Sequence, residues 1–312
     1  MHISNNSSTT ANSCWKKFYW RYVERLTPIR QSSSLTLGSI VHEAFDLHYK
    51  NTPYKDVIKF IAGTFDEEIA KLPPEEQEHL TVAKYTALGM FANFPYKNLA
   101  QFDEVHSEKS FSVKLLNGNR YTDGMTFEGR IDGLVKKNGK WWVRELKTTG
   151  QTSRIFSQRI NTSSQGTGYV WAMKKLGYDV VGLMYDYVKR PLLRKRMSED
   201  QFEFGNRILK DYADKPEAYF NQVYSYRNTH ELNLWEKDIK DQAKEIRRKF
   251  KAGDFYRNTG SCYNYNMECP YNKICFEEHT DNLMLSLYFL RDGEAINADT
   301  LPPKDNVCPR QS

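Results

Sequence analysis

Apolar and polar residues alternate in two runs on either side of the pair Asn138-Gly139. The first run is FEGRIDGLV, starting at Phe127, and the second is WWVRELKTT, ending at Thr149. Both runs are rich in aromatic and β-branched residues, which are typical of strands. Asn-Gly is the commonest sequence of a type I′ turn, because both residues tolerate a positive φ. The pattern therefore predicts a β-hairpin over residues 127–149.

The turn determines which residues of the two strands face each other. With the two turn residues as the loop, Lys137 faces Lys140. Counting outward then places Asp132 opposite Glu145, at a non-hydrogen-bonded position where Cα atoms lie about 4.5 Å apart. Lys147 lies two residues beyond Glu145 and therefore on the same face. That face also carries the apolar residues Leu134, Trp141 and Val143.

Two carboxylates that face each other on a partly apolar surface repel each other, so a positive charge is expected between Asp132 and Glu145. A divalent cation fits, because hard oxygen ligands are typical of Mg²⁺ and Mn²⁺ sites. Lys147 would then steer a metal-bound water. The alternative is a surface hairpin with solvated charges, because a one-residue shift or a bulge would turn Glu145 to the other face.

Apolar residues at helical spacing predict two helices before the hairpin. The polar start MHISNNSSTT is interpreted as disordered, and the helix SCWKKFYWRYVERL follows with Cys14 at its beginning. The second helix, LGSIVHEAFDLHYK, carries His42 at the flank of its apolar stripe. A histidine at such a position packs more often than it binds a ligand. His42 becomes a candidate ligand only if this helix docks against the hairpin.

The segments around the hairpin predict the fold class. Residues 53–101 have a charged, helical pattern and are interpreted as a helical insertion. The run EKSFSVKLL and the turn signal Asn117-Gly118 predict antiparallel strands that lead into the hairpin. After the hairpin, SSQGTGYVWAMKKLGY predicts a helix with Gln165 and Tyr169 on one face, and VVGLMYDYVKRP predicts a buried strand. Alternating strands and helices predict an α/β fold, with a mixed central sheet flanked by helices.

Charge and composition favour a polyanionic partner. The chain has 312 residues, enough for one large or two medium domains, and a formal net charge of +6 with a pI near 8.8. Nucleic acid is the partner class that such an excess favours. No apolar run approaches the ~20 residues of a membrane span, and the polar start lacks the apolar core of a signal peptide. A cytoplasmic protein without a membrane partner is therefore expected.

Two basic clusters could contact phosphates. The first is the octet 189–196, which contains Lys189, Arg190, Arg194, Lys195 and Arg196. The second is the helix LWEKDIKDQAKEIRRKFKAG, whose expected core stripe is Ile239, Ala243, Ile246 and Phe250. A plain solvated surface is the alternative for both clusters, because acidic residues are interspersed with the basic ones.

Five cysteines in an intracellular protein indicate metal binding or free thiols rather than disulfides. Three of them lie in the stretch SCYNYNMECPYNKICFEEH, at Cys262, Cys269 and Cys275. Such a cluster favours metal ligands, and the candidates for a fourth ligand are Cys14, Cys308 and His279. Zinc would accept three cysteines and one histidine, whereas an iron-sulfur cluster prefers four thiolates. The spacing leaves both open, with free thiols as the third alternative.

Four short motifs together resemble the RecB-like branch of the PD-(D/E)xK nuclease superfamily. They are Gly38-x3-His42, Gly129-Arg130-Ile131-Asp132, Glu145-Leu146-Lys147 and Gln165-x3-Tyr169. One cysteine before the first motif and three after the last further resemble the iron-sulfur members, such as the CRISPR-adaptation nucleases and the AddB subunit of helicase-nucleases. The resemblance extends from Cys14 to about Cys275, apart from residues 53–101. The order and spacing of the motifs carry it, since each motif alone is weak.

The resemblance implies a restriction-endonuclease-like core in a single nuclease domain, 1–312, with its active site along the hairpin. The metal ligands for Mg²⁺ or Mn²⁺ would be His42, Asp132, Glu145 and the backbone carbonyl of Leu146. Lys147 would orient the attacking water and stabilise its hydroxide form, while Gln165 and Tyr169 would support the site and touch the nucleic acid. A structural [4Fe–4S] cluster would be held by Cys14, Cys262, Cys269 and Cys275. Residues 255–280 together with Cys14 would form the iron-sulfur subdomain.

The expected function is that of a metal-dependent DNA exonuclease that acts on single-stranded ends, in DNA repair or recombination. No G-x4-G-K-[ST] phosphate loop is present, so a helicase or recombination partner would supply any motor. A phage or mobile-element origin is compatible with the small size. The alternatives are a DNA-binding scaffold with a decayed nuclease site and a structure-selective endonuclease. The intact set of His42, Asp132, Glu145 and Lys147 argues against decay.

Overall fold

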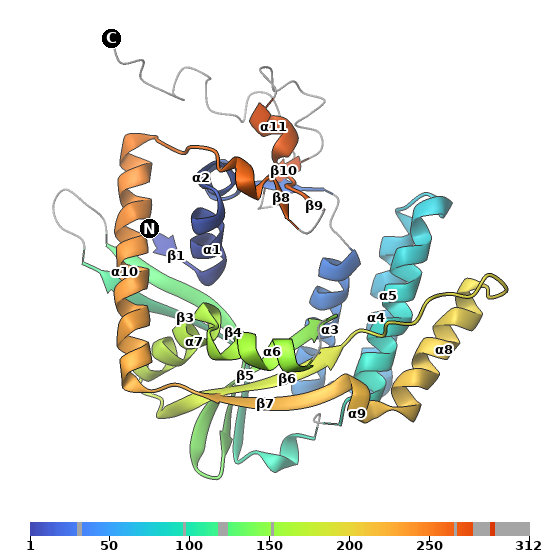
Figure 1. The fold of residues 1–312 in the computed structure, drawn as a ribbon. Coiled ribbons are helices and arrows are strands. Elements are labelled where there is room, and N and C mark those ends of the chain that lie inside the picture. Colours follow the sequence, from blue (N-terminus) through green and yellow to red (C-terminus); the bar gives the residue numbers. More distant parts are fainter. Residues whose placement is uncertain are drawn as a thin grey trace. The chain divides into compact units, whose positions relative to one another are not determined.

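A mixed β-sheet is the central element of the fold (Figure 1). The computed structural model describes residues 1–29, 33–95, 98–117, 124–150, 153–264, 267–276 and 288–290. Five strands of the sheet follow the order β1-β4-β5-β6-β7, and β3 pairs with β4. The pairs β1–β4 and β5–β6 are parallel, whereas β4–β5 and β6–β7 are antiparallel. The six strands are β1 (His2–Ile3), β3 (Glu104–Leu116), β4 (Met125–Lys137), β5 (Lys140–Thr149), β6 (Val180–Lys189) and β7 (Phe220–Tyr226).

The chain divides by its internal contacts into two compact units, which are described separately. The first unit comprises Met1–Gln31, Lys114–Glu128 and Glu236–Ser312. The second unit comprises Ser32–Val113 and Gly129–Trp235. No described helix combines the length and the apolar character that crossing a membrane requires.

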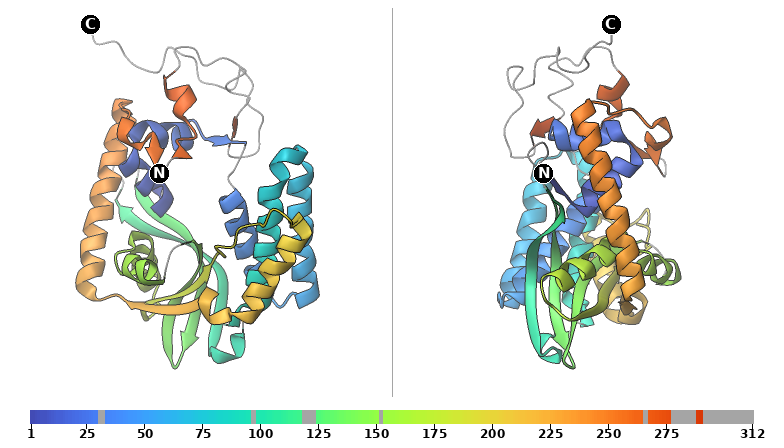
Figure 2. Two further views of the ribbon diagram at one scale, coloured as in Figure 1. Left: turned by 45° about the vertical axis from the view of Figure 1, so that its right-hand side comes forward. Right: turned by 90° about the vertical axis from the view of Figure 1, so that its left-hand side faces the viewer.

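In the second unit, helices cover both faces of strands β5 and β6. The helices on one face are α3 (Ser33–Tyr49), α4 (Tyr54–Ala70), α5 (Gln77–Asn93) and α8 (Gln201–Asp214), which lie side by side (Figures 1 and 2). Their apolar side chains form one core with Leu146 of β5 and Val188 of β6. On the opposite face lie α6 (Ser153–Asn161) and α7 (Ser164–Lys175), which precede β6 in the chain. The predicted α/β class, with a mixed sheet flanked by helices, is confirmed.

Helix α7 approaches β6 and Trp235 of α10 closely because two of its residues are glycines. A Cβ on Gly166 would lie 2.5 Å from Tyr185 Oη, and a Cβ on Gly168 would lie 2.4 Å from the Trp235 ring. Glycine lowers helix propensity by about 1 kcal/mol relative to alanine. Here the missing side chains allow the contacts that hold α7 against its neighbours, so the sequence keeps the glycines and still forms a helix.

The remaining elements of the second unit are short. They are η2 (Pro74–Glu76), η4 (Leu99–Gln101) and α9 (Pro216–Tyr219). The predicted helical pattern of residues 53–101 is confirmed by α4 and α5, which pack against α3 and α8 in the same core. Whether this segment is an insertion stays a prediction.

The first unit contains both ends of the described chain. Its elements before the sheet are α1 (Asn5–Ser13), α2 (Trp15–Phe18), the π-helical turn η1 (Tyr19–Val23) and β2 (Leu26–Pro28). Those after the sheet are α10 (Thr229–Ala252, which begins in the second unit), η5 (Thr259–Ser261), β8 (Tyr263–Asn264), β9 (Met267–Glu268), α11 (Asn272–Phe276) and β10 (Tyr288–Leu290). A small core joins Leu26, Tyr271, Ile274 and Tyr288. Chain segments more than 200 residues apart therefore pack together, for example through the hydrogen bond from Tyr271 Oη to the Leu26 carbonyl at 2.7 Å.

Several expectations about local structure were wrong. The start of the chain is not disordered: β1 and α1 form there, and Ser4 and Ser7 make a capping box at the beginning of α1. The helix expected over SCWKKFYWRYVERL is confirmed for Trp15–Val23, with a π-helical turn from Tyr19, and only its end differs, because β2 begins at Leu26. Phe250 of α10 is 38% exposed rather than part of a core stripe. The turn expected at Asn117-Gly118 falls mostly outside the described residues, which stop at 117 and resume at 124.

Candidate active site

The predicted hairpin and its register are confirmed. Asn138 and Gly139 have φ values of 52° and 74°, as a type I′ turn requires, and Lys137 faces Lys140. The described pairing of β4 with β5 ends at Gly133, beyond which β5 continues alongside β6. The two predicted carboxylates therefore lie where the strands β4 and β5 begin to separate.

Side chains replace the backbone ladder at this fork. The Asp132 amide donates to Glu145 Oε1 at 3.4 Å, and the Leu146 amide donates to Asp132 Oδ2 at 2.9 Å. Each carboxylate thus binds a backbone amide of the other strand, which fixes its position. Glu145 is almost completely buried, with 2% of its side chain exposed, whereas 27% of the Asp132 side chain is exposed. The fork therefore presents one accessible and one buried carboxylate.

Two cationic or protonatable groups face these carboxylates. His42, from α3, places Nδ1 3.3 Å from Asp132 Oδ2. Lys147 Nζ lies 3.1 Å from Glu145 Oε2 and 3.4 Å from Gln165 Oε1. Helix α3 therefore docks against the hairpin, which was the condition for treating His42 as a candidate ligand.

Burial and mutual repulsion give the two carboxyl groups different proton affinities. Burial, together with the charge of Asp132, raises the pKa of Glu145 to about 7, although Lys147 opposes the shift. Burial would also raise the pKa of Asp132, but the hydrogen bond and charge of His42, with Lys147 and the Leu146 amide, hold it below its usual value. Asp132 is therefore the more readily ionised carboxylate of the pair.

The two basic groups respond in the opposite direction. Burial would lower the pKa of Lys147, but the charges of Glu145 and Asp132 outweigh it and raise that pKa. Burial also works against protonation of His42, and the hydrogen bond and charge of Asp132 again reverse the shift. Lys147 is thus held as a cation and cannot act as a general base near neutral pH.

Helix α7 supplies the remaining predicted residues. Gln165 Nε2 donates to Tyr169 Oη at 2.9 Å, so the two side chains share a face as expected. Burial and the charge of Glu145 raise the pKa of Tyr169 to about 12, so its hydroxyl stays protonated. A Cβ on Gly129 would lie 2.7 Å from the Phe111 ring and 3.3 Å from Tyr169. The glycine of the Gly129-Arg130-Ile131-Asp132 motif therefore makes room for the aromatic residue beside the site.

Two residues beside the site were missed from the sequence. Tyr185 pairs with Glu145 in the parallel register of β5 and β6, and its hydroxyl lies 3.4 Å from Ser163 Oγ. Ser163 also caps α7 by accepting a hydrogen bond from the Gly166 amide at 3.1 Å. The serine pair at the start of the predicted helix is a recognisable N-cap signal for Ser163. No local signal gives Tyr185, because its position depends on the register between two distant strands.

The donors at the fork suit a hard divalent cation in their chemistry, since they are carboxylate oxygens and one imidazole. In the arrangement found, however, no three His, Cys, Asp or Glu side chains of the described residues are placed to hold a metal ion. Asp132 Oδ2 and Glu145 Oε2 instead meet the Leu146 amide and Lys147. The site therefore contains suitable ligand atoms, but in this arrangement they accept hydrogen bonds from the Leu146 amide and Lys147.

The four predicted cysteine ligands gather in the first unit. They line one small cavity, together with the cations of Lys17 and Arg257: Cys14, Cys262, Cys269 and Cys275. Cys14 lies between α1 and α2, where its Sγ accepts a hydrogen bond from the Asn258 amide at 3.3 Å, and Cys275 Sγ accepts one from Trp20 Nε1 at 3.2 Å. The alternative ligands His279 and Cys308 lie outside the described residues.

The chain belongs to the PD-(D/E)XK nuclease superfamily, because residues 2–276 match that family. Nucleases of this superfamily act on nucleic acid and generally use divalent metals. The match spans both the hairpin with its two carboxylates and the stretch that contains the last three cysteines. The membership agrees with the mixed sheet and with the position of Asp132, Glu145 and Lys147 on the hairpin.

Two further similarities are weaker. Brefeldin A-inhibited guanine nucleotide-exchange protein 3 from Arabidopsis thaliana is 24% identical over 156 residues, which cover 46% of this chain but only 8% of that protein. A solved structure of a candidate exonuclease from Eubacterium rectale is similar over 90% of this chain and 89% of its own, with 10% identity and a TM-score of 0.48. The first match covers too little of the exchange protein to bear on function. The TM-score of the second is below 0.5, which is too low to establish a common fold.

Proposed function

We propose that the protein is a metal-dependent deoxyribonuclease of the RecB-like branch, which hydrolyses phosphodiester bonds from the ends of single-stranded DNA. One observation carries the proposal: His42, Asp132, Glu145 and Lys147 meet at the fork of β4 and β5, although they come from three separate elements. A surface hairpin with solvated charges would not bury Glu145 beside a half-buried lysine. The concentration of charge in a partly buried site favours a chemical role over a structural one.

The charge of each residue at the site suggests its role. Lys147, held as a cation, would attract the anionic phosphate and favour the hydroxide form of the attacking water. Gln165 would fix the Lys147 ammonium through its carbonyl oxygen, and Tyr169 would fix Gln165 in turn. Asp132, Glu145 and His42, with the Leu146 carbonyl, would hold Mg²⁺ or Mn²⁺. When bound, such an ion neutralises charge on the phosphate and activates water near neutral pH.

Two substitutions test the site. Asp132→Asn and Lys147→Met should each lower the cleavage rate at least about a hundredfold, because the first removes a charged metal ligand and the second removes the cation beside the reacting phosphate. Lys140→Met is the matched control, since Lys140 lies on the same strand but its side chain is 60% exposed. Circular dichroism should report the same fold for all three variants. Full activity of either site variant would refute the assignment.

The substrate distinguishes the exonuclease from its alternatives. Linear and circular single-stranded DNA should be incubated with Mn²⁺ and, separately, with EDTA. An exonuclease degrades only the linear strand and only with the metal. Cleavage of the circle would indicate an endonuclease, and tight binding without any cleavage would indicate a DNA-binding scaffold.

We further propose that Cys14, Cys262, Cys269 and Cys275 hold a structural [4Fe–4S] cluster in a subdomain made of residues 255–280 and Cys14. Their approach around one cavity supports this, and the charge of Lys17 there opposes the rise that burial causes in the pKa of Cys269. A four-iron cluster is larger than one ion, so its thiolates stand farther apart than those of a zinc site. The absence of a single-ion arrangement among the described residues is compatible with that spacing.

The protein purified without oxygen should be brown and should contain iron. Cys262→Ala and Cys14→Ala should lose the colour and lower the stability, because cluster binding stabilises the folded state. Cys308→Ala should keep the colour and serves as the control. A colourless Cys308→Ala protein beside a brown Cys14→Ala protein would make Cys308 the fourth ligand. Zinc in place of iron in the wild type would refute the cluster.

A further inference from the structure

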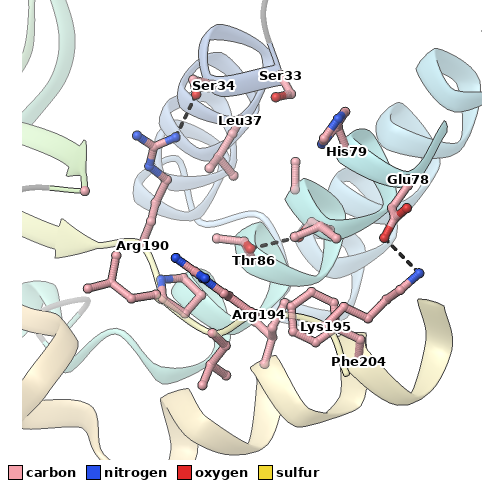
Figure 3. A pocket seen from close by; sticks show the side chains of 17 residues that line it. Ser33, Ser34, Leu37, Glu78, His79, Thr86, Arg190, Arg194, Lys195 and Phe204 are labelled. Carbon is pink, nitrogen blue, oxygen red and sulfur yellow. Dashed lines mark hydrogen bonds and ion pairs between the residues drawn. The ribbon is translucent and has the colours of Figure 1, made fainter. Parts of the chain in front are cut away.

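A second site lies in the same unit as the fork, at the start of helix α3, which also carries His42. It is a cavity of about 570 Å³, within the range of ligand pockets. Its walls are the start of α3, one side of α5, the segment that follows β6 and the side of α8 (Figure 3). Gly150, directly after β5, completes the wall. None of these residues belongs to the fork.

Three cations of the predicted basic octet line this pocket: Arg190, Arg194 and Lys195. Figure 3 shows Arg190 extending to the start of α3, where its Nη1 donates to Ser34 Oγ at 2.7 Å, and Arg194 pointing into the pocket. Lys195 is paired with Glu78, with 2.8 Å between Nζ and Oε1. No described carboxylate lies within ion-pair distance of Arg190 or Arg194. Two guanidinium groups therefore face the pocket without a neutralising anion.

Part of the pocket wall is apolar. It is formed by Leu37 of α3, Ala83 of α5, and Phe204 and Ile208 of α8, and all four are buried. Arginine forks match phosphate oxygens in geometry, and the first turn of a helix, here with Ser33 and Ser34, adds partial positive charge. An anion with an apolar side, such as a nucleotide with its sugar and base, fits both parts of the wall. A simple inorganic anion would leave the apolar wall unused.

Two elements fix the distance between this pocket and the fork. Along β5, Gly150 follows Lys147 by three residues, or about 10 Å of strand. Along α3, Ser34 precedes His42 by eight residues, or about 12 Å of helix. Both routes place the pocket within reach of the same nucleic-acid strand as the fork.

We propose that this pocket binds a phosphate of the nucleic-acid strand whose scissile bond lies at the fork. The proposal rests on the proposed nuclease function and adds where the strand is anchored. Arg190 and Arg194 hold the phosphate, Arg190 being oriented by Ser34, and the apolar wall receives the attached sugar or base. The phosphate is either the terminal group of the strand or an internal phosphodiester, and the two differ in the substrate they require.

Arg194→Gln tests the pocket, with Lys210→Gln as the control. Arg194 is exposed and has no described acidic partner, so its substitution should not disturb the fold. Lys210 is an exposed residue of α8 that does not line the pocket. Arg194→Gln should raise KM about tenfold at unchanged kcat, the size expected for one lost charge-assisted hydrogen bond. Lys210→Gln should change KM by less than about twofold. Arg190→Lys, which keeps the charge but loses the planar guanidinium group with its paired donors, should also raise KM.

The bound group can be identified as a terminal phosphate or an internal phosphodiester with three linear strands. These carry a 5′-phosphate, a 3′-phosphate or no terminal phosphate. A terminal site predicts that Arg194→Gln raises KM only for one phosphorylated strand, whereas an internal site predicts the same rise for all three. Binding of a fluorescent oligonucleotide in EDTA gives a readout without cleavage. In this binding assay, the slope of log K against log salt concentration should become shallower by about 0.7 in Arg194→Gln, because one phosphate contact to a single strand is lost.

The outcomes separate this proposal from the proposed function. If the wild type never cleaves, the nuclease assignment fails, and the binding assay still tests the pocket. If the wild type cleaves but Arg194→Gln matches Lys210→Gln in KM, affinity and salt slope, the pocket proposal is overturned and the nuclease assignment stands. A tenfold loss of affinity confined to Arg194→Gln and Arg190→Lys supports it.

Discussion

The buried ion pair between Arg144 and Asp186 leads to a quantitative prediction about stability. Arg144 Nε lies 2.5 Å from Asp186 Oδ2, and the two side chains are only 4% and 1% exposed. Gln222 Nε2 also donates to Asp186 Oδ1 at 2.8 Å. The Arg144 guanidinium lies 4.8 Å from the centre of the Tyr49 ring, so its surroundings are aromatic as well as charged. Arg144→Met would leave a buried carboxylate with one amide partner.

Removing one partner of such a pair costs about 3–5 kcal/mol, because the other charge stays buried without compensation. Replacing both partners by apolar residues of similar size is often neutral or stabilising. We therefore expect Arg144→Met to lower the free energy of unfolding by about 3–5 kcal/mol, and the double variant Arg144→Met, Asp186→Leu to restore most of that loss. Gln222 is half-buried and can turn its amide to water.

The loss should depend on pH. Burial raises the pKa of Asp186 above its usual value even with Arg144 beside it, and removal of Arg144 would raise it further. The native state then holds a proton that the unfolded chain releases, so stability falls as the pH rises from the unfolded pKa through the folded one. The Arg144→Met variant should therefore be least stable above the folded pKa and recover as the pH falls toward the usual aspartate value.

Urea unfolding of the wild type, both single variants and the double variant gives the coupling energy directly. If Arg144→Met is too unstable to purify, the stability of the double variant relative to the wild type and to Asp186→Leu still tests whether an apolar pair can replace the ion pair. A loss below about 1 kcal/mol for Arg144→Met at neutral pH, the value of an exposed pair, would refute the argument. So would a variant whose stability does not rise with falling pH.

Two further predictions concern packing and a surface carboxyl group. Gly166→Ala should destabilise the protein by up to about 2 kcal/mol, because overpacking against Tyr185 exceeds the gain in helix propensity, whereas Gly63→Ala in α4 should stabilise it, since its Cβ meets nothing within 4 Å. Thermal unfolding that shifts both variants in the same direction would contradict this. Hydrogen bonds from Arg207 hold the pKa of Glu199 at about 2, so its carboxyl should titrate there by NMR, and its contribution to stability should be present above about pH 4.3 and lost as the pH falls toward 2. A midpoint near 4 would show that the pair is absent in solution.

The hairpin could be predicted from sequence because its information is local. Asn138-Gly139 determines the turn, the turn determines the register, and the register places Asp132 near Glu145. The helix of His42 was equally local, as periodicity alone identifies it. What the pattern could not supply was the docking of that helix onto the fork, which depends on packing between distant segments.

The rest of the structure depends on contacts that no local pattern encodes. Asp186 meets Arg144 because β5 and β6 pair in parallel, a register that the connecting helices set rather than a turn. The pocket at the start of α3 joins Glu78, from a segment without recognisable chemistry, to Arg190 after β6. The polar residues at the start of the chain predict disorder, because a short polar helix is stable only when it packs against other elements. That packing is not visible in the local sequence.

The alternation of β5 separates stability from chemistry in this protein. Glu145 and Lys147 point to the face that carries α7 and Gln165, whereas Arg144 and Leu146 point to the face covered by α3 and its neighbours. Consecutive residues of one strand therefore serve the site and the core in turn. Substitutions at 144 or 146 should lower stability and leave kcat of the folded fraction largely unchanged, while those at 145 or 147 should do the reverse. A strand slipped by one residue would exchange the two sets, so the type I′ turn that fixes the β4–β5 register also protects the chemistry.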